Sequence, residues 1–150
     1  MEAVILIGIQ GAGKSTFAKQ RLGDTHVRIS RDVVKSAHRE RVLQYACLSI
    51  GQSFVADNTH PEPRSRASLI AAARAAGFRV VAYYFPPDVP AALVRNLARP
   101  DKQRVPDVAI HATAAKLQPP TRGEGFDARY RVGVGPSGFV TFVIQEVLDE

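Results

Sequence analysis

The 150-residue sequence has no tryptophan, one methionine and one cysteine, and aromatic residues make up only 7% of it. A lone cysteine, Cys47, excludes an internal disulfide, and its apolar helical context indicates packing. No apolar run approaches the roughly eighteen residues that span a membrane. A signal peptide carries a basic segment before its apolar region, and the first apolar run of this sequence has none. We therefore expect a cytoplasmic protein that has no membrane partner.

Acidic residues are the scarcer charge, with 14 against 20 lysines and arginines, which gives a net charge of +6. A basic chain is compatible with a nucleic-acid partner. However, the charge is spread along the sequence without a block of five like residues. An enzyme that handles phosphates is also commonly basic, so the charge alone lends the nucleic-acid interpretation only mild support.

The length and composition are those of a globular domain. A chain of this length can bury a hydrophobic core, and 45% hydrophobic residues is an ordinary content for such a domain. The sequence has no internal repeat and no linker-like segment. We expect residues 1–150 to form one domain.

A complete phosphate-binding motif, G-x-x-x-x-G-K-S, occupies residues 8–15. Residues 3–7 form an apolar run that predicts a buried strand before it, and residues 16–22 predict a helix after it. In such a loop backbone N–H groups surround phosphate oxygens, Lys14 reaches the β- and γ-phosphates, and Ser15 ligates magnesium. We therefore expect ATP or another nucleoside triphosphate with Mg²⁺. The expected nucleotide contacts are Gly8, Gln10, Gly11, Ala12, Gly13, Lys14, Ser15 and Thr16.

Strand and helix patterns alternate along the rest of the chain. Further strands are predicted at residues 26–29, 54–57, 79–85, 130–134 and 139–144. Helices are predicted at 31–52, 62–76, 89–99 and 106–117, and the alternative for the first is a break near His38. Asp88 is expected to cap the third of these helices and to place Val89, Leu93 and Leu97 on one buried face. The alternation predicts a three-layer α/β fold on a mainly parallel sheet. Residues 135–138 predict the turn of a C-terminal β-hairpin.

Two acids follow predicted strands, where ligands bind in open parallel sheets. Asp32 is a candidate base for an acceptor hydroxyl, although an acid also favours the first turn of a helix. Asp57 is a candidate for holding magnesium through water, and the alternative is an Asp-Asn turn. Arg95 and Arg99, four residues apart on the helix after the fourth strand, could stabilise a phosphoryl group in transfer; solvent-exposed helix arginines are the alternative. The four histidines lack metal-ligand spacing and are assigned no role.

The order and spacing of these segments resemble the kinase module of polynucleotide 5′-hydroxyl kinases. The segments are G-x-x-G-x-G-K-S-T at 8–16, Ser-Arg-Asp at 30–32, Asp-Asn-Thr at 57–59, R-N-x-x-R at 95–99, Val-Pro-Asp at 105–107 and Glu-Gly-Phe-Asp at 124–127. The resemblance covers most of the chain, from about residue 4 to residue 127.

The resemblance implies ATP-dependent phosphorylation of the 5′-hydroxyl of DNA or RNA ends. It implies that Asp32 is the general base and that Arg95 and Arg99 grip the donor phosphates from a helical lid. It also implies that Asp57 arranges the acceptor and the metal, and that Lys35 contacts an acceptor phosphate without the bidentate fork of an arginine. The expected catalytic residues are Asp32, Lys14, Arg95 and Arg99. The expected acceptor-binding residues are Arg31, Asp32, Lys35, Asp57, Asn58 and Thr59.

Two other functions fit the same motifs. Stand-alone kinases of small hydroxylated metabolites or antibiotics share most of them, and an NTP-dependent switch that transfers no phosphoryl group shares the phosphate loop. The aromatic run Tyr83, Tyr84 and Phe85 lies in a predicted strand and indicates core rather than a platform for stacking bases. No D-x-D-x-T motif is present, so removal of a 3′-phosphate is not expected of this chain. The choice among DNA, RNA and a small acceptor, between ATP and GTP, and the oligomeric state stay open at this point.

Overall fold

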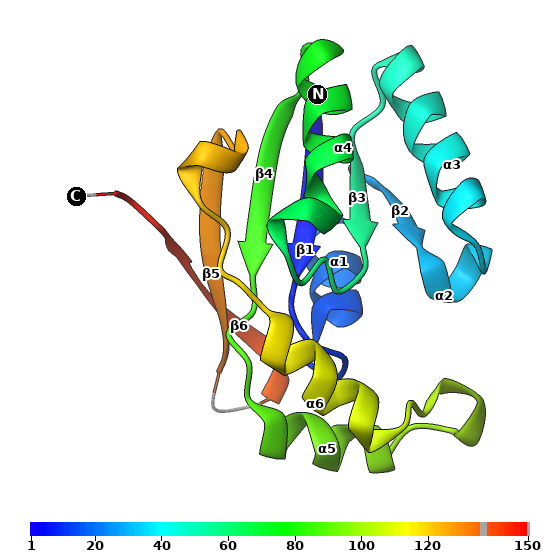
Figure 1. Ribbon diagram of the computed structural model, residues 1–150, viewed down its shortest axis with the longest axis vertical. Helices are drawn as coiled ribbons and strands as arrows, with labels where there is room; N and C mark the ends of the chain where they lie inside the picture. The colour runs from blue at the N-terminus through cyan, green and yellow to red at the C-terminus, as the bar shows by residue number, and fades with distance from the viewer. Residues whose placement is uncertain (136–137, 150) are drawn as a thin grey trace.

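A computed structural model describes residues 1–135 and 138–149 of the protein and contains a six-stranded sheet in the order β2-β3-β1-β4-β5-β6 (Figure 1). The strands are β1 (Glu2–Ile7), β2 (Val27–Ser30), β3 (Phe54–Asp57), β4 (Arg79–Tyr84), β5 (Ala128–Gly135) and β6 (Gly138–Glu146). The first five strands in this list pair in parallel, and β6 is antiparallel to β5 at one edge. The predicted α/β fold on a mainly parallel sheet is confirmed.

The register of the parallel strands aligns their carboxyl ends. Ser30 at the end of β2 lies opposite Asp57 at the end of β3, and Ile7 at the end of β1 lies opposite Tyr84 at the end of β4. The segments that follow these strands therefore emerge at one edge of the sheet, where Figure 1 shows the loop after β1 together with α5 and α6.

Helices cover both faces of the sheet. They are α1 (Lys14–Leu22), α2 (Arg31–Val34), α3 (Ala37–Ile50), α4 (Pro63–Ala75), α5 (Val89–Leu97) and α6 (Asp107–Lys116), with 3₁₀ turns η1 (Asp101–Gln103) and η2 (Arg122–Glu124). Side chains of β1 alternate between two cores, as they must in a strand buried on both faces. Val4 and Leu6 pack with Phe17 of α1, whereas Ile5 packs with Ile70 of α4.

Phe17 connects α1 to both the central sheet and the edge hairpin. Its ring lies 4.9 Å from that of Tyr83, 5.5 Å from that of Phe85 and 5.4 Å from that of Phe142 on β6. Phe85 is buried, and Tyr83 is half-buried and stacks on Tyr130. The aromatic run of residues 83–85 therefore contributes to the core, as predicted.

The long helix predicted over residues 31–52 is two helices, and the break lies before the expected position near His38. Lys35 ends α2 with a left-handed backbone, at φ 69°. Ser36 then begins α3, because its hydroxyl accepts a hydrogen bond from the Arg39 N–H at 3.2 Å. A serine at the N-cap satisfies one of the free N–H groups of a new helix, so the chain restarts here.

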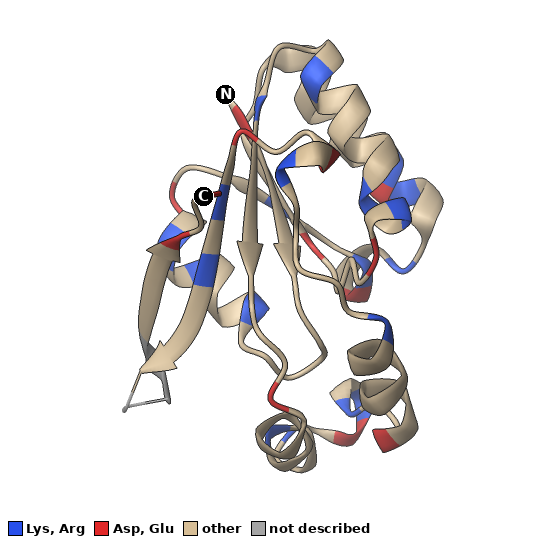
Figure 2. Ribbon diagram, turned by 60° about the vertical axis from the view of Figure 1, so that its left-hand side comes forward, with Lys and Arg blue, Asp and Glu red and all other residues tan. Residues whose placement is uncertain are grey.

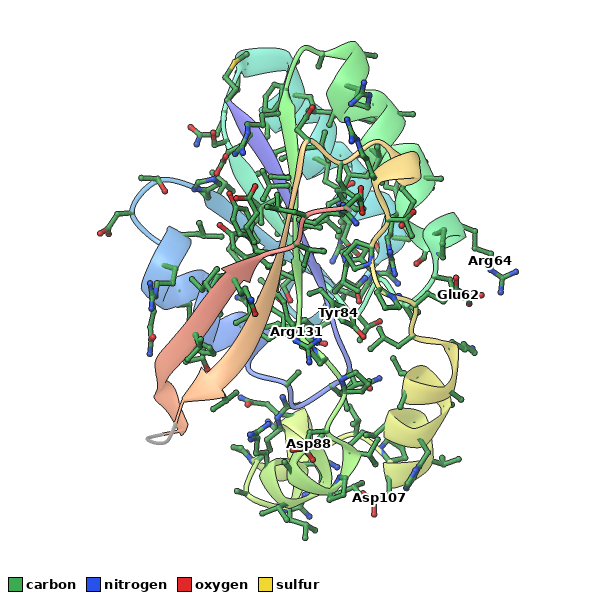
Figure 3. All side chains as sticks on the ribbon, turned by 90° about the vertical axis from the view of Figure 1, so that its left-hand side faces the viewer. Glu62, Arg64, Tyr84, Asp88, Asp107 and Arg131 are labelled. Atoms are coloured by element: carbon green, nitrogen blue, oxygen red, sulfur yellow. The ribbon has the colours of Figure 1, made fainter. Side chains whose placement is uncertain are left out.

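Asp88 caps α5, as predicted, and accepts a hydrogen bond from the Ala91 N–H. The predicted apolar stripe is wrong in part, because Leu97 is 66% exposed while Ala92 and Asn96 are buried. The Asn96 carboxamide donates to the Val105 carbonyl at 2.6 Å and accepts from the Val105 N–H at 3.0 Å. It thus joins α5 to the segment before α6. We call residues 88–117 the lid; Asp88 and Asp107 mark the starts of its two helices in Figure 3.

The predicted hairpin strands are present as β5 and β6, whereas Pro136 and Ser137 of the predicted turn lie outside the described residues. On β5, Arg131 lies opposite Tyr84 of β4, and Figure 3 shows the two side chains near one another. Lysines, arginines and acids are distributed over the sheet, the helices and the lid rather than confined to one element (Figure 2). Of the described helices, none is long and apolar enough to cross a membrane.

Candidate active site

The phosphate loop joins β1 to α1 with two glycines in the left-handed region. Gly11 has φ 78° and Gly13, the N-cap of α1, has φ 96°, values that residues with a side chain rarely adopt. A Cβ on Gly11 would lie 3.1 Å from the Ala92 carbonyl oxygen of α5. Gly11 is therefore needed both for the turn and for the close approach of the lid.

Lys14 closes this loop with its own amine. The buried Nζ donates to the carbonyl oxygen of Gly8 at 2.9 Å and to that of Ile9 at 2.6 Å. Burial lowers the pKa of Lys14 from its ordinary 10.5 to about 8; Asp57 and Asp32 act in the opposite direction, and Arg99 adds to the lowering. The charges of Asp57, Arg99 and Asp32 are thus all close enough to act on one amine.

Ser15 and Asp57 meet beside the loop. The Ser15 hydroxyl donates to Asp57 Oδ2 at 2.8 Å, and Asp57 is buried. A hydroxyl and a carboxylate are hard oxygen donors of the kind that Mg²⁺ prefers. No cluster of three or more His, Cys, Asp or Glu residues is found among the described residues. The pair fits a Mg²⁺ ion that takes its other ligands from phosphates and water, as is usual for nucleotide sites.

Arg28 is a site residue that the sequence interpretation did not include. From β2 its Nε donates to Asp57 Oδ2 at 2.7 Å, and its Nη2 donates to the Ser15 hydroxyl at 3.1 Å. Period-two alternation puts Arg28 on the same face of β2 as Ser30, and Ser30 lies opposite Asp57. The alternation could have identified Arg28 as a site residue, but only if the pairing of β2 with β3 had been known.

The lid brings one predicted arginine into direct contact with the phosphate loop. Arg95 Nη1 donates to the Gly11 carbonyl at 2.9 Å. Arg99 lies past the end of α5, so the prediction that it shares one helix with Arg95 is wrong, although its charge contributes to lowering the pKa of Lys14. Gln10, which we expected at the nucleotide, instead donates to the Thr113 hydroxyl of α6 at 3.1 Å. Its buried Oε1 has no hydrogen-bond partner in the described part of the chain.

On the acceptor side, the predicted residues fall into two groups. Asp32 and Lys35 are on or next to α2; the Asp32 side chain makes no hydrogen bond to another described residue and is exposed. Arg31 pairs through Nε with the buried Glu40. Asp32 is therefore free to meet a ligand, while Arg31 is held against α3.

The second group consists of Asn58 and Thr59 in the loop after β3. Asn58 Oδ1 accepts from the Thr59 N–H at 2.9 Å, and the Thr59 carbonyl accepts from the Gly8 N–H at 3.1 Å. Asp57 is therefore followed by an Asn-Thr turn that fixes the phosphate loop, while its own carboxylate binds Ser15 and Arg28. Arg31, Asn58 and Thr59 line a common pocket of about 250 Å³ between α3 and α4.

Two further buried polar residues hold this region in place. Burial lowers the pKa of His60, whose Nδ1 bonds the Leu6 carbonyl at 2.8 Å, so the neutral ring carries its proton on Nδ1. Arg66 is fully buried and donates to the His60 carbonyl, to both Glu124 oxygens and to the carbonyls of Pro61 and Gln118. Arg66 thus ties the segment after α6 to the loop after β3, and nothing in the local sequence marks it.

Residues 4–120 match the AAA domain family AAA_33. The chain belongs to this family. A bifunctional polynucleotide phosphatase/kinase of Schizosaccharomyces pombe is 26% identical over 129 residues, which make up 83% of this chain and 32% of that protein. The chain thus spans about a third of that relative's length. The resemblance to P-loop polynucleotide kinases is confirmed at the level of the family.

Solved structures share the fold of this AAA-family chain. The AvrRxo1-ORF1:AvrRxo1-ORF2 structure with sulphate ions matches with a TM-score of 0.74 at 14% identity, over 95% of this chain and 57% of that one. Chaetomium thermophilum Kti12 with ADP-AlF3 matches with a TM-score of 0.65 at 16% identity, over 86% of this chain and 87% of that one. A gluconokinase from Sinorhizobium meliloti matches with a TM-score of 0.56 at 14% identity, over 87% of this chain and 82% of that one. The protein is a nucleotide-binding, P-loop kinase-like domain.

Proposed function

We propose that the protein is an ATP-dependent kinase that transfers the γ-phosphate to the 5′-hydroxyl of a DNA or RNA end. The observation that carries the proposal is the pair of contacts at the phosphate loop that Lys14 closes: Ser15 donates to Asp57 at the end of β3, and Arg95 of the lid donates to the Gly11 carbonyl. Phosphoryl transfer needs cations, an acid for the metal and a carboxylate for the acceptor hydroxyl around one phosphate loop. The likeness to the yeast phosphatase/kinase supports a polynucleotide acceptor.

The residues divide the reaction between them. Lys14 exchanges the Gly8 and Ile9 carbonyls for phosphate oxygens, while Arg95 and Arg99 balance the charge of the phosphoryl group in transfer. Magnesium bound at Ser15 and Asp57 would neutralise charge on the β- and γ-phosphates. Asp32 orients the acceptor hydroxyl and takes its proton as the bond from acceptor oxygen to γ-phosphorus forms. The bond from the γ-phosphorus to the bridging oxygen breaks, and ADP leaves.

The test is transfer of labelled γ-phosphate from ATP to 5′-hydroxyl oligonucleotides, DNA and RNA, with magnesium. A 5′-phosphorylated oligonucleotide of the same sequence is the matched control, because it lacks the acceptor hydroxyl. We expect label on the 5′-hydroxyl strand alone. No label on either nucleic acid would rule the proposal out.

A kinase of a small hydroxylated molecule is the second candidate, and the pocket between α3 and α4 favours it. Its volume of about 250 Å³ lies below the roughly 300 to 1,000 Å³ of typical ligand pockets, so it suits a small molecule and cannot enclose an oligonucleotide. A panel of nucleosides, sugars and polyols in the same assay separates the candidates. Label on a small molecule without label on oligonucleotides would select this second function.

A further inference from the structure

Gln44 of α3 is a polar residue for which the fold supplies no partner. It is 8% exposed and lines the pocket between α3 and α4, and its carboxamide makes no hydrogen bond within the described ranges. A carboxamide carries two donor hydrogens and an acceptor oxygen. The amide atoms of Gln44 are not among the fully buried, unpaired polar atoms of the described residues, so they are accessible from the pocket and open to a ligand that enters it. The position points to a ligand rather than to packing.

The rest of the pocket is polar and close to the proposed base. Asn58 and Ser68 line it with an amide and a hydroxyl, and Arg31, the neighbour of Asp32, lines it on the α2 side. The buried carboxylate of Glu40 also lines the pocket and makes its interior unfavourable for a phosphate. Arg41 lines it as well and is exposed. The pocket thus suits a neutral ring with hydrogen-bonding edges, with a cation available for a phosphate outside.

We propose that this pocket, which we call the Gln44 pocket, binds the 5′-terminal nucleoside of the acceptor, and that Gln44 hydrogen-bonds its base. The inference rests on the proposed function and adds to it the residues that select the acceptor. A carboxamide pairs with adenine through two hydrogen bonds, donor to acceptor and acceptor to donor. Acceptors that begin with adenosine are therefore expected to bind best.

A second hollow, also lined by residues of α3, provides the matched control. Val34, His38, Arg39, Val42 and Leu43 line a more apolar depression of about 580 Å³ over α2 and α3. Ser68 and Val42 are both exposed, so a tryptophan at either site fills its own hollow without disturbing the core. Comparing the acceptor KM of Ser68→Trp with that of Val42→Trp therefore shows which hollow receives the acceptor.

The experiment measures KM and kcat for oligonucleotides that start with each of the four bases, and affinity for a fluorescent ATP analogue. Gln44→Leu keeps the size of the side chain and removes its hydrogen bonds. We expect it to raise the acceptor KM about tenfold, to erase the preference for adenosine and to leave ATP affinity within twofold. Ser68→Trp should raise KM at least as much, and Val42→Trp should leave it unchanged.

The outcomes separate this inference from the proposed function. Wild-type protein that labels no oligonucleotide refutes the function; the pocket is then judged by chemical shifts of the Gln44 side-chain amide on addition of adenosine, where no shift overturns it. Oligonucleotide labelling with an unchanged acceptor KM in both Gln44→Leu and Ser68→Trp overturns the pocket alone. If Gln44→Leu does not fold, Ser68→Trp against Val42→Trp decides, and a larger effect of Val42→Trp counts against the pocket.

Discussion

The two sides of the site differ in how far their residues are already bonded to one another. On the donor side Lys14 holds two carbonyls of its own loop, and Ser15, Asp57 and Arg28 form a closed set of hydrogen bonds. On the acceptor side Asp32 and Gln44 have no hydrogen-bond partner among the described residues. The donor side is thus held ready by its own contacts, whereas the acceptor side presents free groups to a ligand.

Replacing Lys14 is expected to have the largest effect on the donor side. Lys14→Met removes the cation that faces the phosphates, so we expect triphosphate binding and turnover to fall at least about a hundredfold. The folded protein should not lose stability in proportion, because keeping a charged lysine buried is itself unfavourable. Binding of a fluorescent ATP analogue and urea unfolding measure the two effects. Lys19→Met, at an exposed position of the same helix, is the control; full nucleotide affinity in Lys14→Met would make the loop merely structural.

The next largest effect is expected at the acceptor side. Asp32→Ala removes the group proposed to take the proton, which should lower kcat about 10²- to 10⁴-fold while ATP affinity stays within twofold. Single-turnover transfer and nucleotide titration give the two numbers. The exposed surface acid Asp24, changed to Ala, serves as the reference. Wild-type kcat in the Asp32 variant would remove this residue as the base.

The lowered pKa of Lys14 predicts opposite pH dependences for binding and for stability. Above pH 8 the free protein loses the Lys14 proton that phosphates need, so nucleotide affinity should fall up to tenfold per pH unit, with proton uptake in calorimetry. Unfolded lysine keeps its proton up to about 10.5, so the unfolded state binds more protons between pH 8 and 10.5 and stability should rise there.

Lys14→Met is the reference for this pH experiment as well. Burial raises the pKa of Tyr83 and Tyr84, which has the opposite effect on stability above pH 10. Those two groups are present in both proteins, so the difference between wild type and variant isolates Lys14. A difference in stability that stays flat from pH 7 to 10 would show that Lys14 is not the titrating group.

The smallest expected effect concerns Arg28, the cation that contacts Asp57, the acid proposed to bind the metal. Arg28→Met should free the Asp57 carboxylate and lower the Mg²⁺ concentration needed for half-maximal ATP binding by a few-fold, as expected when a competing hydrogen-bonded cation is removed. Binding is followed by fluorescence across a Mg²⁺ titration, without acceptor. Arg64→Met, which changes an exposed arginine on α4 (Figure 3), should leave the Mg²⁺ requirement unchanged. An increased requirement in Arg28→Met would mean that Arg28 supports the metal site.

Local signals predicted most elements of the fold. The β3 strand was expected at residues 54–57 and is present there, and Asp88 caps α5 as predicted. The mistakes arose where packing overrides the helical repeat. Leu97 was placed on a buried face, but α5 instead buries Ala92 against Gly11 and Asn96 against the Val105 segment. A polar Asn is buried because its two hydrogen bonds replace those it would make with water.

The phosphate loop was predictable from its own stretch of sequence, because a strand, a turn with glycines at positive φ and a helix start are set by contacts between neighbouring residues. The residues that surround that loop come together through tertiary packing. Asp32, Asp57 and Arg99 come from three segments whose convergence depends on the order and register of β1, β2, β3 and β4. The same register brings Arg28 to Asp57, and the arrangement of α3 and α4 places Gln44 in the pocket between them, without a hydrogen-bond partner among the described residues. Such long-range contacts depend on how the strands and helices pack, and no local pattern in the chain records them.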